Sequence, residues 1–253
     1  MTQSDTTIEK KSFRFRAAAL LLAIVMVGTG ISMMVAARLG VAPADVFSTG
    51  GAKQLHIGVG TMGWISGALF TLLAIAVKRP PTWGTLIGTV LVGQVVNIVL
   101  PLMPEPSVMA WRVVMMIAGM ALLYFAISIG VATTLGTGPM ELLMLGLNDK
   151  GLSMQVGRWG IEAVVVTAGI LRGGQIGVGT ILFVILTGPI LARTLPPMVR
   201  FMGTDVIQQP TALDAELVFG RRLDKTLFAS SLSISSSFML RMSRSTLRLS
   251  SPR

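Results

Sequence analysis

Long apolar runs, separated by short polar or proline-containing stretches, dominate this sequence. A helix needs about 20 predominantly apolar residues to cross the hydrocarbon core of a bilayer, and six runs approach that length. Most are bounded by charged residues, glycine or proline, which favour helix ends over helix interiors. The pattern predicts an all-α, polytopic membrane protein with about six transmembrane helices. The predicted spans are residues 17–37, 61–77, 83–103, 110–132, 156–171 and 177–197.

The first apolar run follows a basic lead over residues 1–16. A cleavable signal peptide shares this order, because small residues such as Ala36 and Ala37 stand near the end of the run. The apolar core of a signal peptide is usually about 7–15 residues long, however, and this run is longer. We therefore expect a retained span that begins on the cytoplasmic side.

Two segments between spans are too short and too mixed in composition to cross a bilayer. The first covers residues 43–55, beginning with Pro43 and carrying Asp45; the second begins with Pro139 and carries Glu141. Proline suits the first turn of a helix, and a nearby acid interacts favourably with the positive end of the helix dipole. We expect two short helices, either interfacial or re-entrant.

The two short helices belong to an internal repeat, which covers residues 17–103 and again residues 110–198. Each copy contains three spans, an odd number, so the second copy must enter the membrane from the opposite face. The cations agree with this inverted topology, because they gather on the side that would be cytoplasmic. Matching positions, with one-residue adjustments, are Pro43 with Pro139, Val59-Gly60 with Val156-Gly157, and Gly84-Thr85 with Gly179-Thr180.

The repeated pattern resembles the YczE/YitT-type family of bacterial integral membrane proteins, closer to the YczE side, over about residues 20–197. The resemblance implies a multi-pass protein of the inner membrane without an established catalytic activity. The first copy departs from the glycine-rich form, because Ala42 stands where the second copy has Gly138. The motif positions are Gly40, Pro43, Asp45, Gly60, Gly84, Gly136, Gly138, Pro139, Glu141, Gly157 and Gly179.

The amino-acid composition argues against several kinds of functional site. Hydrophobic residues make up 52% of the chain and charged residues only 13%. With no cysteine and a single His56, the chain has no thiolate nucleophile and no Cys/His metal cluster, so we expect neither a cofactor nor a metal. The sequence Gly58-x-Gly-x-x-Gly63 runs into a span rather than a soluble βαβ unit, which argues against a dinucleotide site.

The formal net charge of +10 gathers largely at the two ends of the chain. This distribution favours binding of the termini to anionic lipid headgroups, and it argues against nucleic acid. The tail, residues 199–253, is rich in serine and arginine, and we expect it to be largely disordered. A basic amphipathic helix on the membrane surface is the alternative for its last part.

Six polar side chains are candidates for a substrate or ion pathway. Asp45 and Glu141 either support their own helix starts or present carboxylates to a central cavity. Arg158 and Glu162 are four residues apart and can pair along one helix face, either inside the membrane or near the headgroups. Gln94 and Asn97 either line the same cavity or join helices.

No arrangement of these residues predicts an enzyme. The leading hypothesis is a transporter or permease-like protein for a small solute, with its site at the repeat interface. The alternative is a membrane scaffold or regulatory partner whose repeats only build a stable bundle. In both cases we expect a multi-pass protein of the bacterial inner membrane with cytoplasmic termini. The sequence specifies neither the solute nor the oligomeric state.

Overall fold

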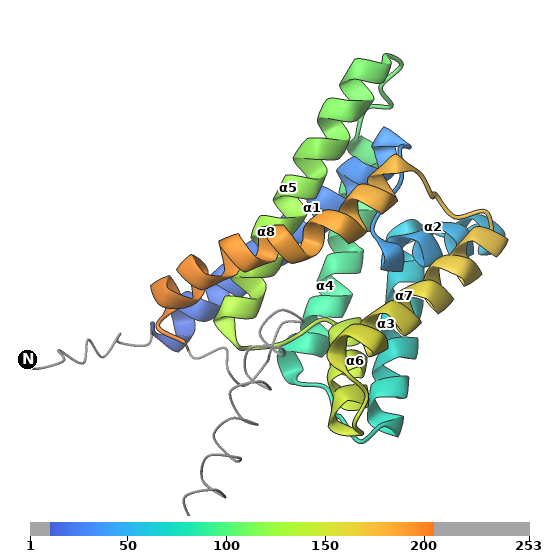
Figure 1. The fold of residues 1–253 in the computed structure, drawn as a ribbon. Coiled ribbons are helices and arrows are strands. Elements are labelled where there is room, and N and C mark those ends of the chain that lie inside the picture. Colours follow the sequence, from blue (N-terminus) through green and yellow to red (C-terminus); the bar gives the residue numbers. More distant parts are fainter. Residues whose placement is uncertain (1–10, 205–253) are drawn as a thin grey trace, which may run out of the picture. The chain divides into compact units, whose positions relative to one another are not determined.

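A computed structural model describes residues 11–204, and these residues form only helices, which confirms the all-α prediction (Figure 1). The predictions for the start of the lead and for most of the tail lie outside the described residues. The helices are α1 (Phe13–Ala37), α2 (Pro43–Leu55), α3 (Val59–Ala76), α4 (Trp83–Val99), the 3-10 helix η1 (Leu100–Leu102), α5 (Met109–Thr133), α6 (Pro139–Asp149), α7 (Met154–Leu171) and α8 (Val178–Met202).

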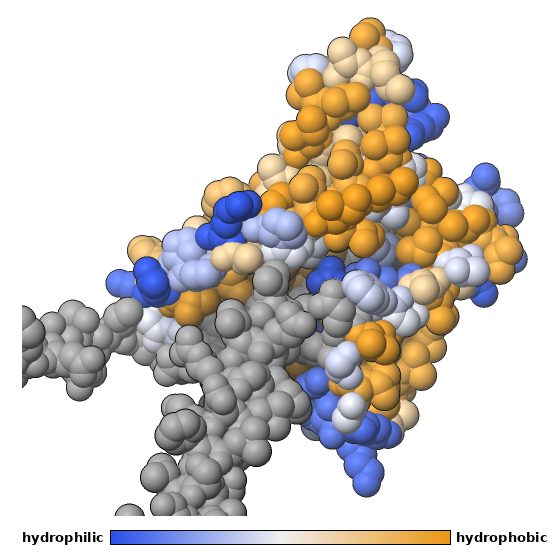
Figure 2. Space-filling model, in the orientation of Figure 1, coloured by the Kyte–Doolittle hydropathy of each residue, from blue (hydrophilic) through white to orange (hydrophobic). Residues whose placement is uncertain are grey.

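Five of these helices are long and apolar enough to cross a membrane: α1, α3, α4 with η1, α5 and α8. Helix α7 occupies the remaining predicted span but is not among the five, and Arg158 and Glu162 interrupt its apolar sequence. Apolar side chains cover the outside of α5, where Val114 and Ile117 are exposed (Figure 2). Such a surface suits lipid contact, so the prediction of a polytopic membrane protein is confirmed.

Helices α1 and α5 pack against each other along most of their length and run in opposite directions. Gly30 faces Gly119, and a Cβ on either glycine would lie 2.9 Å from the carbonyl oxygen of the other. Further along, Ala23 lies beside Gly130. Small residues at these positions let two helix backbones approach closely, which favours association of helices within a membrane.

The remaining helices assemble around this pair in a corresponding way. Helix α4 packs on α1 as α8 packs on α5, and α2 packs on α7 as α6 packs on α3. Helices α2 and α3 are also in contact, as are α6 and α7. The correspondence ends at the last pair, because α3 packs closely on α4 whereas α7 and α8 have at most a marginal contact.

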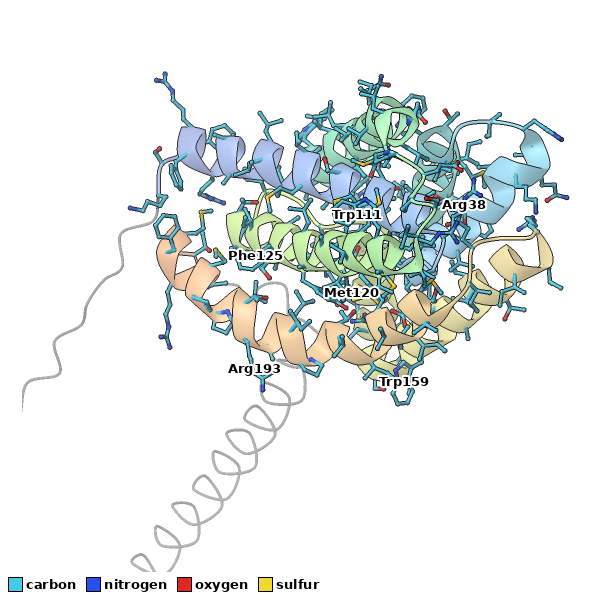
Figure 3. All side chains as sticks on the ribbon, turned by 90° about the horizontal axis from the view of Figure 1, so that it is seen from above. Arg38, Trp111, Met120, Phe125, Trp159 and Arg193 are labelled. Carbon is cyan, nitrogen blue, oxygen red and sulfur yellow. The ribbon has the colours of Figure 1, made fainter. Side chains whose placement is uncertain are left out.

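The main apolar core lies where α1, α5 and α8 meet the start of α2. Tyr124 is almost fully buried there and stacks on Phe183, with ring centroids 5.2 Å apart. Val41 and Val46 are fully buried in the same cluster. Figure 3 shows Met120 among the packed helices, whereas Trp159 and Arg193 point outward.

Helix α1 begins at Phe13, within the residues predicted to form the basic lead. Arg16 is only 8% exposed and reaches the carboxyl end of α5. Its Nε donates to the Thr133 carbonyl oxygen at 2.8 Å, and its Nη2 donates to the same oxygen and to the Thr134 hydroxyl. The last carbonyl groups of a helix lack partners within the helix and attract cations, so Arg16 stabilises this helix end.

Candidate functional site

The chain turns between α1 and α2 through Leu39 and Gly40. Gly40 has a φ of +111°, which glycine adopts readily and other residues do not. The Leu39 carbonyl oxygen accepts a hydrogen bond from the Gly179 amide at 2.8 Å. A Cβ on Gly40 would lie 2.8 Å from the amide nitrogens of Gly177 and Thr180. We call this contact between the Leu39–Gly40 stretch and the first turn of α8 the α8 junction.

The second copy of the stretch makes the corresponding contact with α4. A Cβ on Gly136 would lie 2.6 Å from the Gly84 carbonyl carbon and from the Thr85 amide nitrogen. The Thr82 hydroxyl donates to the Leu135 carbonyl oxygen at 3.3 Å. This contact is the α4 junction. Each stretch that precedes a short helix therefore packs on the last long helix of the other half of the chain.

The two junctions differ in one hydroxyl group. At the α4 junction the Thr85 hydroxyl is hydrogen-bonded to the Thr82 hydroxyl at 3.0 Å. At the α8 junction Gly177 takes the position of Thr82, and the Thr180 hydroxyl is buried without a hydrogen-bond partner among residues 11–204. The α8 junction therefore has one hydroxyl group fewer than the α4 junction, and its remaining hydroxyl lacks a hydrogen bond within the described residues.

Helix α6 begins level with the middle of α3. Pro139 Cγ lies 3.7 Å from the position of a Cβ on Gly67, the middle of α3, and Gly146 packs on Val77, just beyond the end of α3. Asp149, at the end of α6, pairs with Arg79 at 2.7 Å. Helix α6 therefore runs parallel to the second half of α3. If α3 crosses the membrane, this placement corresponds to a re-entrant helix.

Helix α2 packs in a similar way on the end of α7. A Cβ on Gly50 would meet the backbone of Gly169 and Gly174. The Thr49 hydroxyl accepts a hydrogen bond from the Gln175 amide at 3.0 Å. Glycine allows this backbone-to-backbone approach because it has no side chain. Each short helix is thus held by glycines against a longer helix of the other half.

The two first-turn acids have different environments. Asp45 is partly buried, and its carboxylate has no hydrogen bond or ion pair among the described residues; burial raises the pKa of Asp45 to about 7. Glu141 is exposed, and its carboxylate folds back over Gly138, the N-cap residue of α6. Glu141 therefore has the position of an acid that supports its own helix start. No hydrogen bond within residues 11–204 joins Asp45 to Glu141.

Arg158 and Glu162 form the predicted pair, with Arg158 Nε 2.8 Å from Glu162 Oε1. Their side chains are 23% and 11% exposed, so the protein encloses most of this ion pair. Arg158 also lies within electrostatic reach of the Tyr124 hydroxyl, which donates to the Phe183 carbonyl oxygen at 3.0 Å. Helix α7 itself packs mainly on α2 and α6.

Sequence reasoning missed the hydroxyl groups that α5 and α8 contribute to the contact between them, near Tyr124. The Tyr124 hydroxyl is within 3.4 Å of the Thr187 hydroxyl, and the Ser128 hydroxyl is 2.6 Å from that of Thr194. Their spacing offers a signal, because Tyr124 and Ser128 are one turn apart and Thr187 and Thr194 two turns apart. Each pair lies on one face of an apolar helix.

Asn97 joins two helices, the second of its two predicted roles. Its Nδ2 donates to the Thr61 hydroxyl at 3.0 Å, and its Oδ1 accepts from the Thr61 amide at 3.2 Å. Gln94 is exposed on the outer side of α4. The structure thus places Asn97 at the start of α3, where Gly60 packs on Gly93, and does not join it to Arg158 or to the two first-turn acids.

Only some glycines of α3 and α7 lie at close helix contacts. Gly67 packs on Thr89, whereas Gly63 has no neighbour within 4 Å of the position of its Cβ. Gly157 has only Leu147 at 4.0 Å, although its counterpart Gly60 is tightly packed. Among the described residues no group of three or more acidic or histidine side chains could hold a metal ion.

Comparison with known proteins supports the predicted resemblance. A family model described as a family of unknown function (DUF6198) matches residues 14–195. The uncharacterized membrane protein YczE of Bacillus subtilis is 29% identical over 195 residues, which cover 76% of this chain and 91% of the relative. An uncharacterized protein of Haemophilus influenzae is 28% identical over 173 residues, covering 68% of this chain and 79% of the relative. Solved structures gave no significant match.

Proposed function

This chain belongs to the DUF6198 family of unknown function, and we propose from the arrangement of its helices that it is a transporter or permease-like protein for a small solute. The observation that carries the proposal is the pair of reciprocal junctions. Each junction brings the start of a short helix next to the start of a long helix from the other half of the chain. In transporters built from inverted repeats, interrupted helices meet near the bilayer midplane in this manner.

The helix packing supports an inverted repeat. Helices α1 and α5, which begin the two halves, run antiparallel, as an axis in the membrane plane requires. The α8 junction and the α4 junction exchange with each other under the same operation. The register is that of the sequence repeat, because Gly40 and Gly136 correspond, as do Thr180 and Thr85.

The packing also supports an inner-membrane topology with both ends of the described chain on the cytoplasmic side. The Lys11 amide donates to the Met202 carbonyl oxygen at 3.1 Å, so the start of α1 and the end of α8 lie together. Lys11, Arg14 and Arg200 surround this point, and cytoplasmic segments carry an excess of such cations.

In this proposal Asp45 and the Arg158–Glu162 pair are the groups that act on the solute or on a coupled ion. Asp45 stands in the first turn of a short helix and has no charged partner among residues 11–204, so it would bind a cation or carry a proton. Arg158 and Glu162 form a largely enclosed ion pair on a helix that would lie in the membrane, where charged groups are costly unless function retains them. Glu141 is a weaker candidate for the pathway than Asp45, because its carboxylate lies over the start of its own helix.

Flux through vesicles tests the proposal. The purified protein is reconstituted and assayed for proton movement with a pH-sensitive dye, and for uptake of a defined mixture of amino acids, sugars and carboxylates by mass spectrometry. We expect flux above that of empty vesicles, and loss of flux for Asp45→Asn and for the double variant Asp45→Asn/Glu141→Gln. Asp149→Asn is the matched control, because Asp149 pairs with Arg79 at a helix end. Wild-type flux in the double variant would remove these acids from the pathway.

A second candidate function is a membrane scaffold or regulatory partner. The observation that favours it is the tight glycine packing of both junctions, where Gly40 and Gly136 bring backbone against backbone. A closely packed bundle of this kind suits a structural role, which requires no passage for a solute. Absence of flux for every tested probe, combined with recovery of a defined membrane partner by crosslinking in cells, would favour this function over transport.

A further inference from the structure

We propose that the start of α1 and the end of α8 form a binding site for the headgroup of an anionic phospholipid. We call this site the aromatic–basic corner and define it by Lys11, Arg14, Phe15, Arg200 and Phe201. It is independent of the proposed transport pathway, because none of its residues contributes to either junction or to the Arg158–Glu162 pair.

The corner is built by contacts between residues far apart in the sequence. Phe15 and Phe201 meet edge to face, with ring centroids 6.0 Å apart. The Lys11 ammonium lies 5.6 Å from the centre of the Phe201 ring, a cation–π distance, and the Lys11 amide is hydrogen-bonded to α8. Figures 1 and 3 both show the start of α1 beside the end of α8.

The side chains of the corner are exposed, although a hydrogen bond joins the two backbone segments. Phe15 is 42% exposed and Phe201 is 57% exposed, even though each ring contacts the other. The residue before each ring is an exposed arginine, Arg14 on α1 and Arg200 on α8. The corner therefore presents two aromatic rings flanked by cations from both helices.

The charge of the corner is of one sign. Neither α1 nor α8 contains an acidic residue. The ion pairs among residues 11–204 involve Arg38, Arg79 and Arg158, and none of them involves a residue of the corner. The described surface of the corner is therefore positively charged and complements an anionic partner.

The position of the corner near a bilayer surface favours a lipid as the anionic partner. Helices α1 and α8 are both long and apolar enough to cross the membrane, so their adjacent ends lie near a bilayer surface. Aromatic rings favour the headgroup level, and arginine and lysine side chains reach toward lipid phosphates there. The rings would contact the glycerol and upper acyl region while the three cations surround the phosphate.

Lipid titration of the purified full-length protein tests the site. Binding of phosphatidylglycerol and of phosphatidylcholine is measured by native mass spectrometry for wild type and for Arg14→Gln/Arg200→Gln. One cation near an anionic lipid contributes about fivefold in affinity, so the double variant should bind phosphatidylglycerol about 25-fold more weakly. Its weak binding of phosphatidylcholine should not change.

The matched control is Lys78→Gln/Lys150→Gln, which removes the same charge from the ends of α3 and α6. We expect this control to bind phosphatidylglycerol as wild type does. Equal weakening in both double variants would overturn the proposal, since it would show a general charge effect. Wild-type binding without preference for phosphatidylglycerol would also overturn it. If soluble glycerophosphate competes as well as the lipid does, the site is a free-phosphate site and the lipid assignment is wrong.

A variant of the aromatic pair gives an independent check. Phe201→Leu keeps all the cations but removes the ring that Lys11 and Phe15 contact. We expect weaker retention of phosphatidylglycerol with an unchanged melting temperature in detergent without lipid. Unchanged lipid retention in this variant would contradict a role for the rings.

Discussion

Gly40 leaves no room for a side chain beside Thr180, because a Cβ on Gly40 would lie 2.8 Å from both the amide nitrogen and the hydroxyl of Thr180. The glycine also has a positive φ. Because of these two constraints, the turn before α2 can pack on the first turn of α8 only with glycine at this position. The same turn in the second half is held by Gly136 against α4.

Replacement of either junction glycine should destabilise the protein. Overpacking and backbone strain each cost about 1–3 kcal/mol, so we expect Gly40→Ala to lower the free energy of unfolding by more than Gly136→Ala, which meets steric conflict alone. The measurement is thermal unfolding in detergent.

Gly160→Ala is the control for this prediction, because nothing lies within 4 Å of the position of its Cβ in α7. Alanine is favoured over glycine inside a helix by up to about 1 kcal/mol, so this variant should be neutral or slightly more stable. If all three variants have the same stability, close packing at the junctions does not hold the fold.

The inverted topology predicts that Lys53 and Lys150 face opposite sides of the membrane. The chain contains no cysteine, so Lys53→Cys and Lys150→Cys give single thiols without further engineering. Both lysines are exposed. In intact cells a membrane-impermeant maleimide should label Lys53→Cys, whereas Lys150→Cys should react only after permeabilisation.

Arg172→Cys should behave as Lys53→Cys does, because α2 packs on the end of α7. Labelling of the Lys53 and Lys150 positions from one side would contradict an inverted repeat, even if the flux assay succeeded.

Disruption of the Arg158–Glu162 pair should cost stability because it leaves one charge enclosed without its partner. We expect Glu162→Ala to cost about 2–3 kcal/mol, less than a fully buried pair because Arg158 keeps some exposure. Arg38→Ala breaks the pair with Glu105, whose side chains are 53% and 69% exposed, and should cost at most about 1 kcal/mol.

The double variant Arg158→Met/Glu162→Met should be more stable than Glu162→Ala, because it leaves no lone charge. Thermal unfolding of the single and double variants measures this coupling. A double variant that is as unstable as the sum of its single changes would show that the two side chains act independently.

The Asp45 carboxyl predicts a pH dependence of stability. Burial raises its pKa to about 7, above the ordinary value of 3.8, so the folded protein favours the neutral acid. In the unfolded chain Asp45 ionises at lower pH, and its contribution to stability therefore decreases as pH rises from about 4 to about 7. Above this range the full penalty is present.

Asp45→Asn should remove this dependence, because asparagine resembles the neutral acid in shape and does not ionise. Relative to wild type, we expect the variant to gain melting temperature at pH 8 and to differ little at pH 4. Asp149→Asn should lack this pattern, since Asp149 is paired and exposed. Parallel pH profiles for wild type and Asp45→Asn would contradict an effect of burial on this carboxyl group.

The positions of the helices could be predicted closely from local sequence patterns. The apolar runs predicted the long helices, and Pro43 and Pro139 begin α2 and α6 as a proline in the first turn predicts. The end of α8 did not follow from local rules, because the helix continues through Pro196 and Pro197 to Met202. Transmembrane helices tolerate proline more readily than soluble helices do, since neighbouring groups satisfy the freed backbone.

The candidate site followed from the sequence only where it depends on neighbours along one helix. The spacing of Arg158 and Glu162 predicted their pair, because residues four apart share a helix face. The burial of Arg16 and the hydroxyl groups beside Tyr124 could not be predicted. They depend on contacts with residues more than 50 positions away.

The sequence by itself determined the helices, the repeated stretches before α2 and α6, and the class of membrane protein, because apolar length and helix-start chemistry are local properties. Only the tertiary structure decided that each stretch packs on the last helix of the other half, and that α3 contacts α4 while α7 is largely separate from α8. Apolar helices in lipid associate through close packing of small residues rather than through burial from water. A hydrophobic pattern therefore does not specify which helices become neighbours.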